Sequence, residues 1–118
     1  MSTIRTIFIY ADWKLGAMRF IIRAQLSTEV GNKMMGNPDS LKELEAYIKN
    51  IGAENAYFFE ANGDRTMVFI ANMERADQMA TLAEPLFMLG AKVEFHPVMV
   101  LEDLKKINEG RLVAKSIS

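Results

Sequence analysis

Apolar and polar residues alternate between positions 19 and 26, which is the pattern of a strand with one buried face. The apolar face holds Phe20, Ile22, Ala24 and Leu26, and the other face holds Arg19, Ile21, Arg23 and Gln25. Residues 92–98 alternate in the same way, with Lys92, Glu94 and His96 on one face and Val93 and Phe95 on the other. The sequence therefore predicts an early strand and a late strand, each with a polar face.

Helical periodicity occurs twice between these two strands. The first helix is predicted to follow Asn37 as its N-cap, with Pro38 at the first helical position. Its apolar stripe consists of Leu41, Leu44, Ile48 and Ile51. The second helix is predicted to be capped by Asn72, and Pro85 is expected to kink or divide it because proline removes a helical hydrogen bond.

Two other segments complete the pattern. Residues 27–36 contain two glycines and the pair Met34-Met35, and they are predicted to form a loop that either covers a pocket or includes a short helical turn. After the late strand, Leu101, Leu104 and Ile107 recur at helical spacing and predict a short closing helix.

The dipeptide Asn62-Gly63 lies between two apolar runs and is the strongest local signal in the chain. A two-residue type I′ turn needs positive φ at both positions, which Asn-Gly tolerates, so a tight hairpin is predicted. Glu60 and Arg65 are expected to face each other as a structural ion pair. The same register pairs Tyr57 with Val68 and Phe58 with Met67.

The order strand, helix, hairpin, helix, strand predicts an α+β domain with the ferredoxin-like βαββαβ pattern. In that fold a four-stranded antiparallel sheet carries helices on one face, and the first and last strands are neighbours. Both faces of the predicted hairpin are apolar, and one layer of helices covers only one of them. A partner subunit is expected to cover the other face, which gives a homodimer of the dimeric α+β barrel type.

The domain is predicted to span residues 18–108, with a loose tail at 109–118. Residues 1–17 are interpreted either as an extension upstream of Met18, an alternative start, or as an extra strand at Ile4 to Tyr10. That apolar run is too short to cross a bilayer and lacks the features of an export signal. The chain has no cysteine and a net charge of -1, so we expect a cytoplasmic protein that binds neither nucleic acid nor membranes.

Several short motifs across residues 18–108 resemble a family of short uncharacterised bacterial proteins. They are Glu29-Val30-Gly31-Asn32, Ala56-Tyr57-Phe58, Gly63-Asp64-Arg65-Thr66, Ala83-Glu84-Pro85-Leu86-Phe87, Glu94-Phe95-His96-Pro97-Val98-Met99 and Glu102-Asp103-Leu104. The resemblance implies a bacterial origin and supports the fold, but it implies no chemistry. More distantly, Leu86-Phe87 before a Val-Glu strand that ends at Pro97 is similar to the end of muconolactone isomerase, a dimeric α+β barrel.

The best candidate site follows from the predicted pairing of the early and late strands. Arg19, Arg23 and Gln25 would then share a sheet face with Lys92, Glu94 and His96. Arg23 could anchor a carboxylate, His96 could transfer a proton, and Glu94 could orient that histidine. Cross-strand salt bridges at a dimer interface are the favoured alternative, because alternating charges on neighbouring strands commonly pair. Tyr57 and Phe59 would either contact a ligand or belong to the core or interface.

Three hypotheses of function follow. The first is a homodimer that binds a small anionic or aromatic metabolite, without a cofactor or metal. The second is a cofactor-independent isomerase or monooxygenase with His96 and Glu94 as catalytic residues. The third is a structural or regulatory module whose sheet face only forms the dimer. Ligand binding predicts a polar cavity beside Arg23, whereas an interaction module predicts that the same face is filled.

Overall fold

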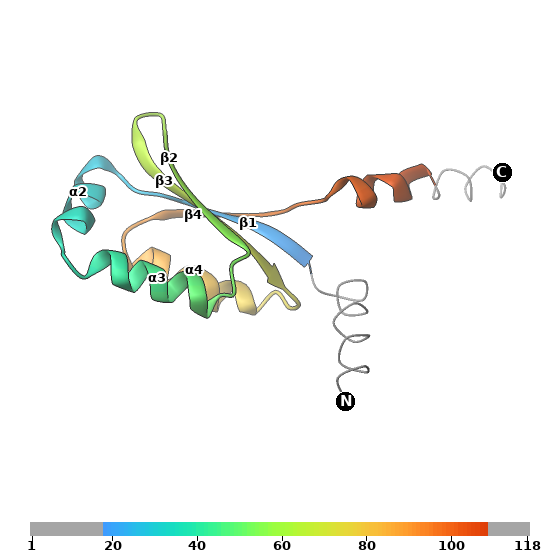
Figure 1. The fold of residues 1–118 in the computed structure, drawn as a ribbon, viewed down its shortest axis with the longest axis horizontal. Helices are drawn as coiled ribbons and strands as arrows, with labels where there is room; N and C mark the ends of the chain where they lie inside the picture. The colour runs from blue at the N-terminus through green and yellow to red at the C-terminus, as the bar shows by residue number, and fades with distance from the viewer. Residues whose placement is uncertain (1–17, 109–118) are drawn as a thin grey trace.

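The computed structural model describes residues 18–108 of the chain, and these form an α+β domain (Figure 1). The elements are β1 (Met18–Gln25), α2 (Thr28–Gly36), α3 (Ser40–Asn50), β2 (Asn55–Ala61), β3 (Asp64–Met73), α4 (Gln78–Met88), β4 (Lys92–Pro97) and a helix over 101–108. The predictions for residues 1–17 and for the tail at 109–118 lie outside the described residues. No helix within 18–108 is long and apolar enough to cross a membrane.

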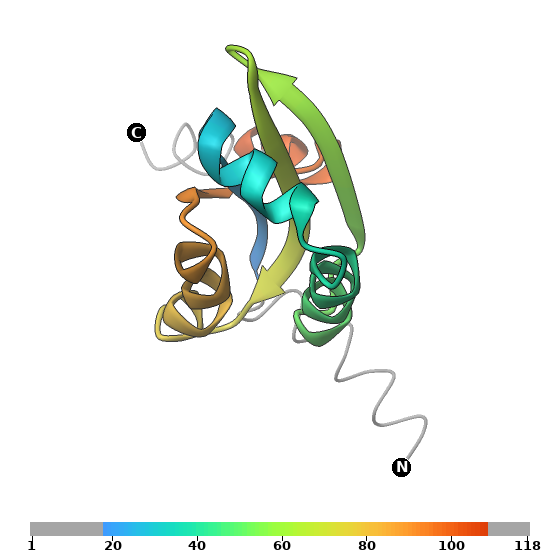
Figure 2. The ribbon, with the colours of Figure 1, turned by 90° about the vertical axis from the view of Figure 1, so that its left-hand side faces the viewer.

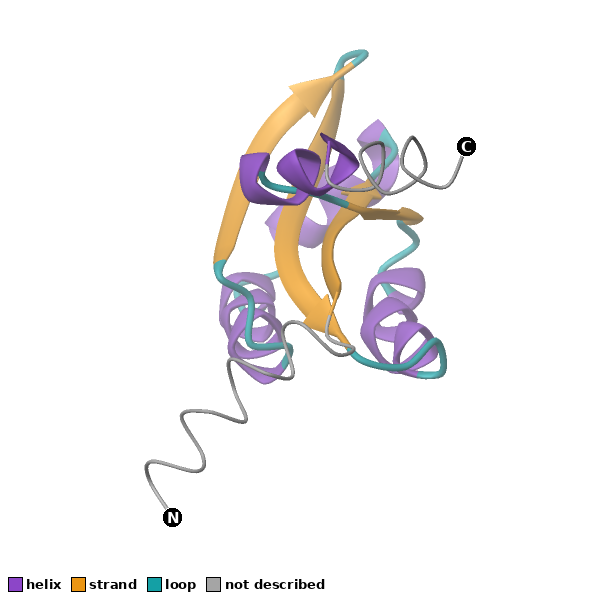
Figure 3. Cartoon of the chain, turned by 90° about the vertical axis from the view of Figure 1, so that its right-hand side faces the viewer, coloured by secondary structure: helices purple, strands orange, loops and turns teal. Residues whose placement is uncertain are grey.

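The strands form one antiparallel sheet in the order β2-β3-β1-β4. The predicted pairing of the first and last strands is therefore confirmed. Helices α2, α3 and α4 lie on one side of the sheet (Figure 2). Figure 3 views the molecule from the other side, with the sheet in front of these helices. This arrangement is compatible with a ferredoxin-like fold, with α2 as an additional helix between β1 and α3.

The core lies between the sheet and this helical layer. The alternation in β1 produces it, because Phe20, Ile22 and Ala24 are buried while the residues between them are half-buried. The largest fully buried apolar side chains are Phe69, Ile22, Leu26 and Leu86. Full burial of such a side chain contributes about 1.5–3 kcal/mol, so β1 and β3 bind the helices mainly through these residues.

The hairpin between β2 and β3 has the predicted turn and the predicted register. Asn62 and Gly63 have φ angles of 55° and 83°, which are the left-handed values that a type I′ turn requires. The pairs Tyr57 with Val68, Phe58 with Met67 and Glu60 with Arg65 all form. The expected Glu60–Arg65 ion pair is absent from the described residues, because Glu60 accepts a hydrogen bond from the Gly63 N–H instead.

Helix α2 replaces the loop that was predicted between β1 and α3. The Ser27 hydroxyl accepts a hydrogen bond from the Val30 N–H and caps the helix, Glu29 lies in its first turn and Lys33 in its last. The short helical turn that was the alternative for this segment is therefore a helix of nine residues.

Two predicted helix starts were wrong. Asn72 does not cap a helix; it belongs to β3, which continues to Met73 opposite Met18, and α4 begins at Gln78. The Asn37 side chain accepts a hydrogen bond from the Asp39 N–H, and α3 begins at Ser40, later than predicted. Pro85 lies inside α4 without dividing it. The predicted closing helix forms over 101–108 but extends away from the sheet (Figure 1).

One buried hydrogen bond joins the two long helices. The Tyr47 hydroxyl of α3 donates to the Leu82 carbonyl of α4 at 2.7 Å. The Tyr47 ring also packs edge-on against Phe69, with centroids 5.3 Å apart. Burial raises the pKa of the Tyr47 hydroxyl to about 12, because the charged phenolate would lose its hydration.

We expect Tyr47→Phe to lower the free energy of unfolding by about 1 kcal/mol, the net contribution of one intramolecular hydrogen bond. The ring and its contact with Phe69 remain in this variant. Chemical denaturation at neutral pH, followed by circular dichroism, measures the difference.

Tyr57→Phe is the matched control, since Tyr57 is 54% exposed and its hydroxyl has no hydrogen-bonding partner among the described residues. Because the folded-state pKa of Tyr47 is raised, its neutral form stabilises the fold below about pH 10, and this contribution is lost as the pH rises from about 10 to 12. Equal unfolding free energies for the two variants, or the same alkaline loss in both, would contradict this account.

Candidate functional site

The face of the sheet opposite the helices carries the predicted site residues; we call it the open face (Figure 3). In the pairing of β1 with β4, Ile21 lies opposite His96, Arg23 opposite Glu94 and Gln25 opposite Lys92. The predicted sharing of one face by these polar residues is therefore correct.

Of the predicted site residues, Arg23, Glu94 and His96 lie close enough to form a cluster. The Arg23 guanidinium donates a hydrogen bond to the Glu94 carboxylate at 3.0 Å, and His96 Nε2 lies 3.8 Å from the same carboxylate oxygen. The hydrogen bond and charge of Arg23, with a smaller contribution from His96, hold the pKa of the Glu94 carboxyl below its usual range. Arg23 thus already has a carboxylate partner, as the salt-bridge alternative proposed.

Arg19 and Gln25 make separate structural contacts. Arg19 donates to Glu54 at 3.2 and 3.3 Å, and Asn72 donates to the same oxygen at 3.2 Å. The Gln25 side-chain amide donates to the Ala61 carbonyl at 2.9 Å, which ties β1 to the end of β2. Neither residue joins the cluster of Arg23, Glu94 and His96.

The middle of β2 and β3 contributes apolar residues to the open face. Tyr57 and Phe59 of β2 are 54% and 46% exposed. The cross-strand register places Tyr57, Val68 and Arg23 in one row and Ile70, Ile21 and His96 in the next. The open face thus has an apolar half on β2 and β3, where Tyr57 and Phe59 are exposed and Val68 and Ile70 half-buried, beside a mainly charged half on β1 and β4.

A cavity of about 280 Å³ lies under the hairpin, between β2–β3 and helices α2 and α3. We call it the hairpin cavity. Its walls are mainly apolar side chains, including Leu26, Met34, Leu41, Leu44, Phe58 and Met67. Arg65 is the one charged side chain among its lining residues. Small-molecule sites are commonly apolar cavities with a few polar or charged groups that orient the ligand.

The Arg65 guanidinium is held against α2. Its Nη1 donates to the Asn32 side-chain oxygen at 2.9 Å. A Cβ atom on Gly31 would lie 2.8 Å from the same nitrogen, so only glycine allows this approach. Asn32 is the one hydrogen-bonding partner of the Arg65 side chain within residues 18–108, which leaves its other guanidinium N–H groups able to donate to a ligand.

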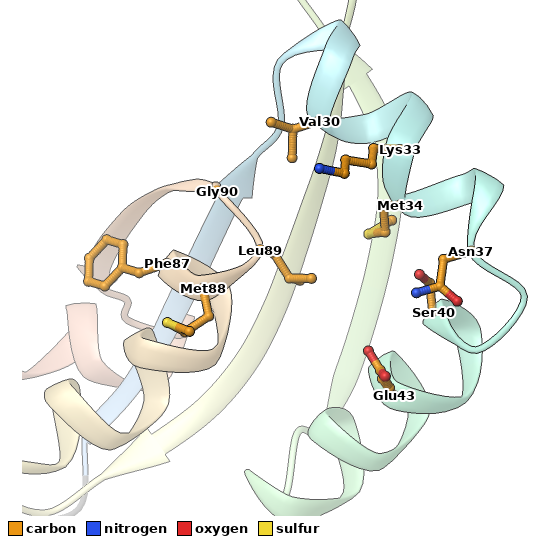
Figure 4. Close-up of a pocket in the computed structure, with 10 residues that line it drawn as sticks. All are labelled: Val30, Lys33, Met34, Asn37, Ser40, Glu43, Phe87, Met88, Leu89 and Gly90. Atoms are coloured by element: carbon orange, nitrogen blue, oxygen red, sulfur yellow. The ribbon is translucent and has the colours of Figure 1, made fainter.

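A second cavity of about 370 Å³ lies between α2, the start of α3 and the end of α4 (Figure 4). We call it the helix-end cavity. Val30, Met34 and Leu89 form its apolar part, and four polar side chains also line it: Lys33, Asn37, Ser40 and Glu43. Met34 contributes to the walls of both cavities.

Sequence reasoning gave a pocket covered by residues 27–36 as one alternative, but it placed neither cavity and named no site residue in them, although one signal was available. Ser27 followed by Glu29 and Lys33 is a helix-capping and charge pattern, and it would have placed Val30 and Met34 on one helical face, four residues apart. The polar cavity predicted beside Arg23 is not among the cavities described above. Binding by Arg23 and proton transfer by His96 stay predictions.

No protein-family model matches the chain, and no curated protein matches it. The resemblance to short bacterial proteins and to muconolactone isomerase therefore stays a prediction. The structure supports its coarser part, a small α+β domain with a four-stranded antiparallel sheet.

We expect Arg23→Met to raise the pKa of Glu94 towards the ordinary value for a glutamate, because the hydrogen bond and charge that lower it are removed. A side-chain carboxyl titration followed by NMR measures this pKa. Arg19→Met is the control, since Arg19 contacts Glu54 rather than Glu94. A pKa of Glu94 that responds equally to both substitutions would show that Arg23 has no specific effect.

Proposed function

We propose that the protein is a homodimer that binds a small aromatic or apolar carboxylate in the hairpin cavity of each subunit. The observation that carries the proposal is the position of Arg65, the one charged residue among those that line an otherwise almost entirely apolar cavity. No covalent chemistry is required of the site, so the proposed activity is binding.

The chemistry of the cavity supports this class of ligand. Burial of an aromatic or branched aliphatic group against Leu44, Phe58 and Met67 is favourable by about 25 cal/mol per Å² of apolar surface. The guanidinium presents a planar set of donors that matches a carboxylate. Arg23 is a weaker candidate for this role, because Glu94 already occupies it.

The exposed apolar half of the open face supports the homodimer. An antiparallel sheet with one face on its core normally presents polar residues on the other, whereas Tyr57, Phe59, Val68 and Ile70 lie on this one. Two copies packed through their open faces would cover these residues and form a dimeric α+β barrel. Because a twofold interface is self-complementary, Arg23 and Glu94 of each copy would lie in or beside it.

Helix 101–108 adds a second exposed apolar surface. Leu101, Leu104 and Ile107 are 67%, 44% and 49% exposed. They recur at helical spacing, and the helix extends away from its own sheet (Figure 1). In the proposed dimer this helix has the partner subunit as a surface to pack against.

For the ligand site, we expect benzoate and phenylacetate to raise the melting temperature of the protein, and benzyl alcohol to raise it much less. Arg65→Met should weaken carboxylate binding by about 10-fold or more, the effect of losing a hydrogen bond to a charged group. Thermal shift identifies the ligands, and isothermal titration calorimetry gives the dissociation constants. Arg75→Met is the control, because Arg75 pairs with Asp77 outside the cavity.

Gly31→Ala provides a test that leaves Arg65 in place. The added methyl group would displace the guanidinium from Asn32, so carboxylate affinity should fall while the helix is retained. Gly36→Ala, at the end of the same helix with open space around it, should bind normally. Unchanged affinity in both Arg65→Met and Gly31→Ala would exclude Arg65 as the ligand's partner.

For the dimer, we expect Ile70→Lys to shift the protein from dimer to monomer, because it places a charge in the apolar half of the open face. Analytical ultracentrifugation over a range of concentrations measures the association. Ala80→Lys makes a comparable change at an exposed position of α4 and should leave the dimer intact. A wild-type protein that is monomeric at all concentrations would disprove the homodimer without affecting the ligand site.

A further inference from the structure

We infer that the helix-end cavity binds a free α-amino acid with an apolar side chain. This site is separate from the proposed carboxylate site, and it takes a ligand that carries both signs of charge. The cavity has two ionic side chains, several polar donors and an apolar wall (Figure 4).

Lys33 and Glu43 give the cavity one cation and one anion. Lys33 comes from the last turn of α2 and Glu43 from the first turn of α3. They form no ion pair with each other or with any other residue between 18 and 108, although both line the same space. Two opposite charges that face one cavity without pairing are complementary to a carboxylate and an ammonium group on a single ligand.

The polar donors support the carboxylate end. The Asn37 side-chain oxygen accepts from the Asp39 N–H, which leaves its NH₂ group to donate. Ser40 is 8% exposed, and its hydroxyl has no hydrogen-bonding partner within the described chain. A ligand oxygen in this cavity would accept a hydrogen bond from this hydroxyl. We place the ligand carboxylate near Lys33, Asn37 and Ser40, and the ammonium near Glu43.

The apolar wall defines the side chain of the ligand. Val30, Met34 and Leu89 are half-buried and pack against the core. A Cβ atom on Gly90 would lie 3.3 Å from both methyl groups of Val30, so α2 is in close contact with the end of α4 here. This contact brings the apolar wall next to the polar donors, and an aliphatic or thioether side chain would lie against it.

The experiment is an NMR titration of the isotope-labelled full chain with L-leucine, L-methionine and L-phenylalanine. Amide shifts of Ser40, Leu89 and Gly90 report binding in the helix-end cavity. We expect saturable shifts at these amides with at least one amino acid. 4-Methylpentanoate is leucine without its ammonium group, and 3-methylbutylamine is leucine without its carboxylate. Measured by the shifts of these amides, each should bind about 10-fold more weakly than leucine.

Glu43→Gln and Lys33→Met should each weaken amino-acid binding by about 10-fold, with Glu45→Gln and Lys42→Met as matched controls. Glu45 pairs with Lys49 outside the cavity, and Lys42 is exposed on α3. The inference is overturned if no amino acid shifts the three amides at millimolar concentration. It is also overturned if the singly charged analogues bind equally well, or if Glu43→Gln behaves like Glu45→Gln.

The outcome is independent of the proposed carboxylate site. A carboxylate in the hairpin cavity should shift amides of Phe58 and Met67 and should depend on Arg65 rather than on Glu43. Either site can therefore fail while the other is confirmed.

Discussion

The antiparallel pairing of β1 with both β3 and β4 is the constraint on which the rest of the structure depends. In the sheet, β1 lies between β3 and the edge strand β4, so it alone joins the β2–β3 hairpin to β4. Its alternation directs Phe20, Ile22 and Ala24 into the core and Arg19, Arg23 and Gln25 to the open face. The connections before and after the β2–β3 hairpin return over one face of the sheet, which places α2, α3 and α4 together. Both cavities follow from this placement, since one lies between these helices and the other between α2, α3 and the hairpin.

The elements with local signals were predictable from the sequence. Asn62-Gly63 determines a turn within four residues, and the register of the hairpin follows from it without any distant contact. The alternating pattern of β1 and β4 predicted which residues share a face. The prediction that Asn72 caps a helix was wrong because of a tertiary contact. Asparagine is a favourable helix cap, but this segment pairs with the start of β1 and so stays extended.

The residues of the proposed sites were harder to predict for a similar reason. Gly31 lowers the helix propensity of its segment by about 1 kcal/mol, which favoured the interpretation of a loop. Its role is apparent only when Arg65, 34 positions later by number, lies against it. The same applies to the choice between arginines. Arg23 and Arg65 are equally suited to a carboxylate in the sequence, and only the structure shows that one has Glu94 beside it while the other has the neutral amide of Asn32.

Met34 belongs to the walls of both cavities. An unbranched thioether side chain has three rotatable bonds and adapts its shape at low cost. A molecule bound in one cavity would restrict the rotamers of Met34 and so change the space left in the other. Ligands bound in both cavities would therefore be thermodynamically linked, although each site can still bind without the other. The linkage would be reciprocal, since each ligand would change the affinity of the other by the same factor. One flexible side chain thus gives a domain of this size the physical basis for cooperative or antagonistic binding.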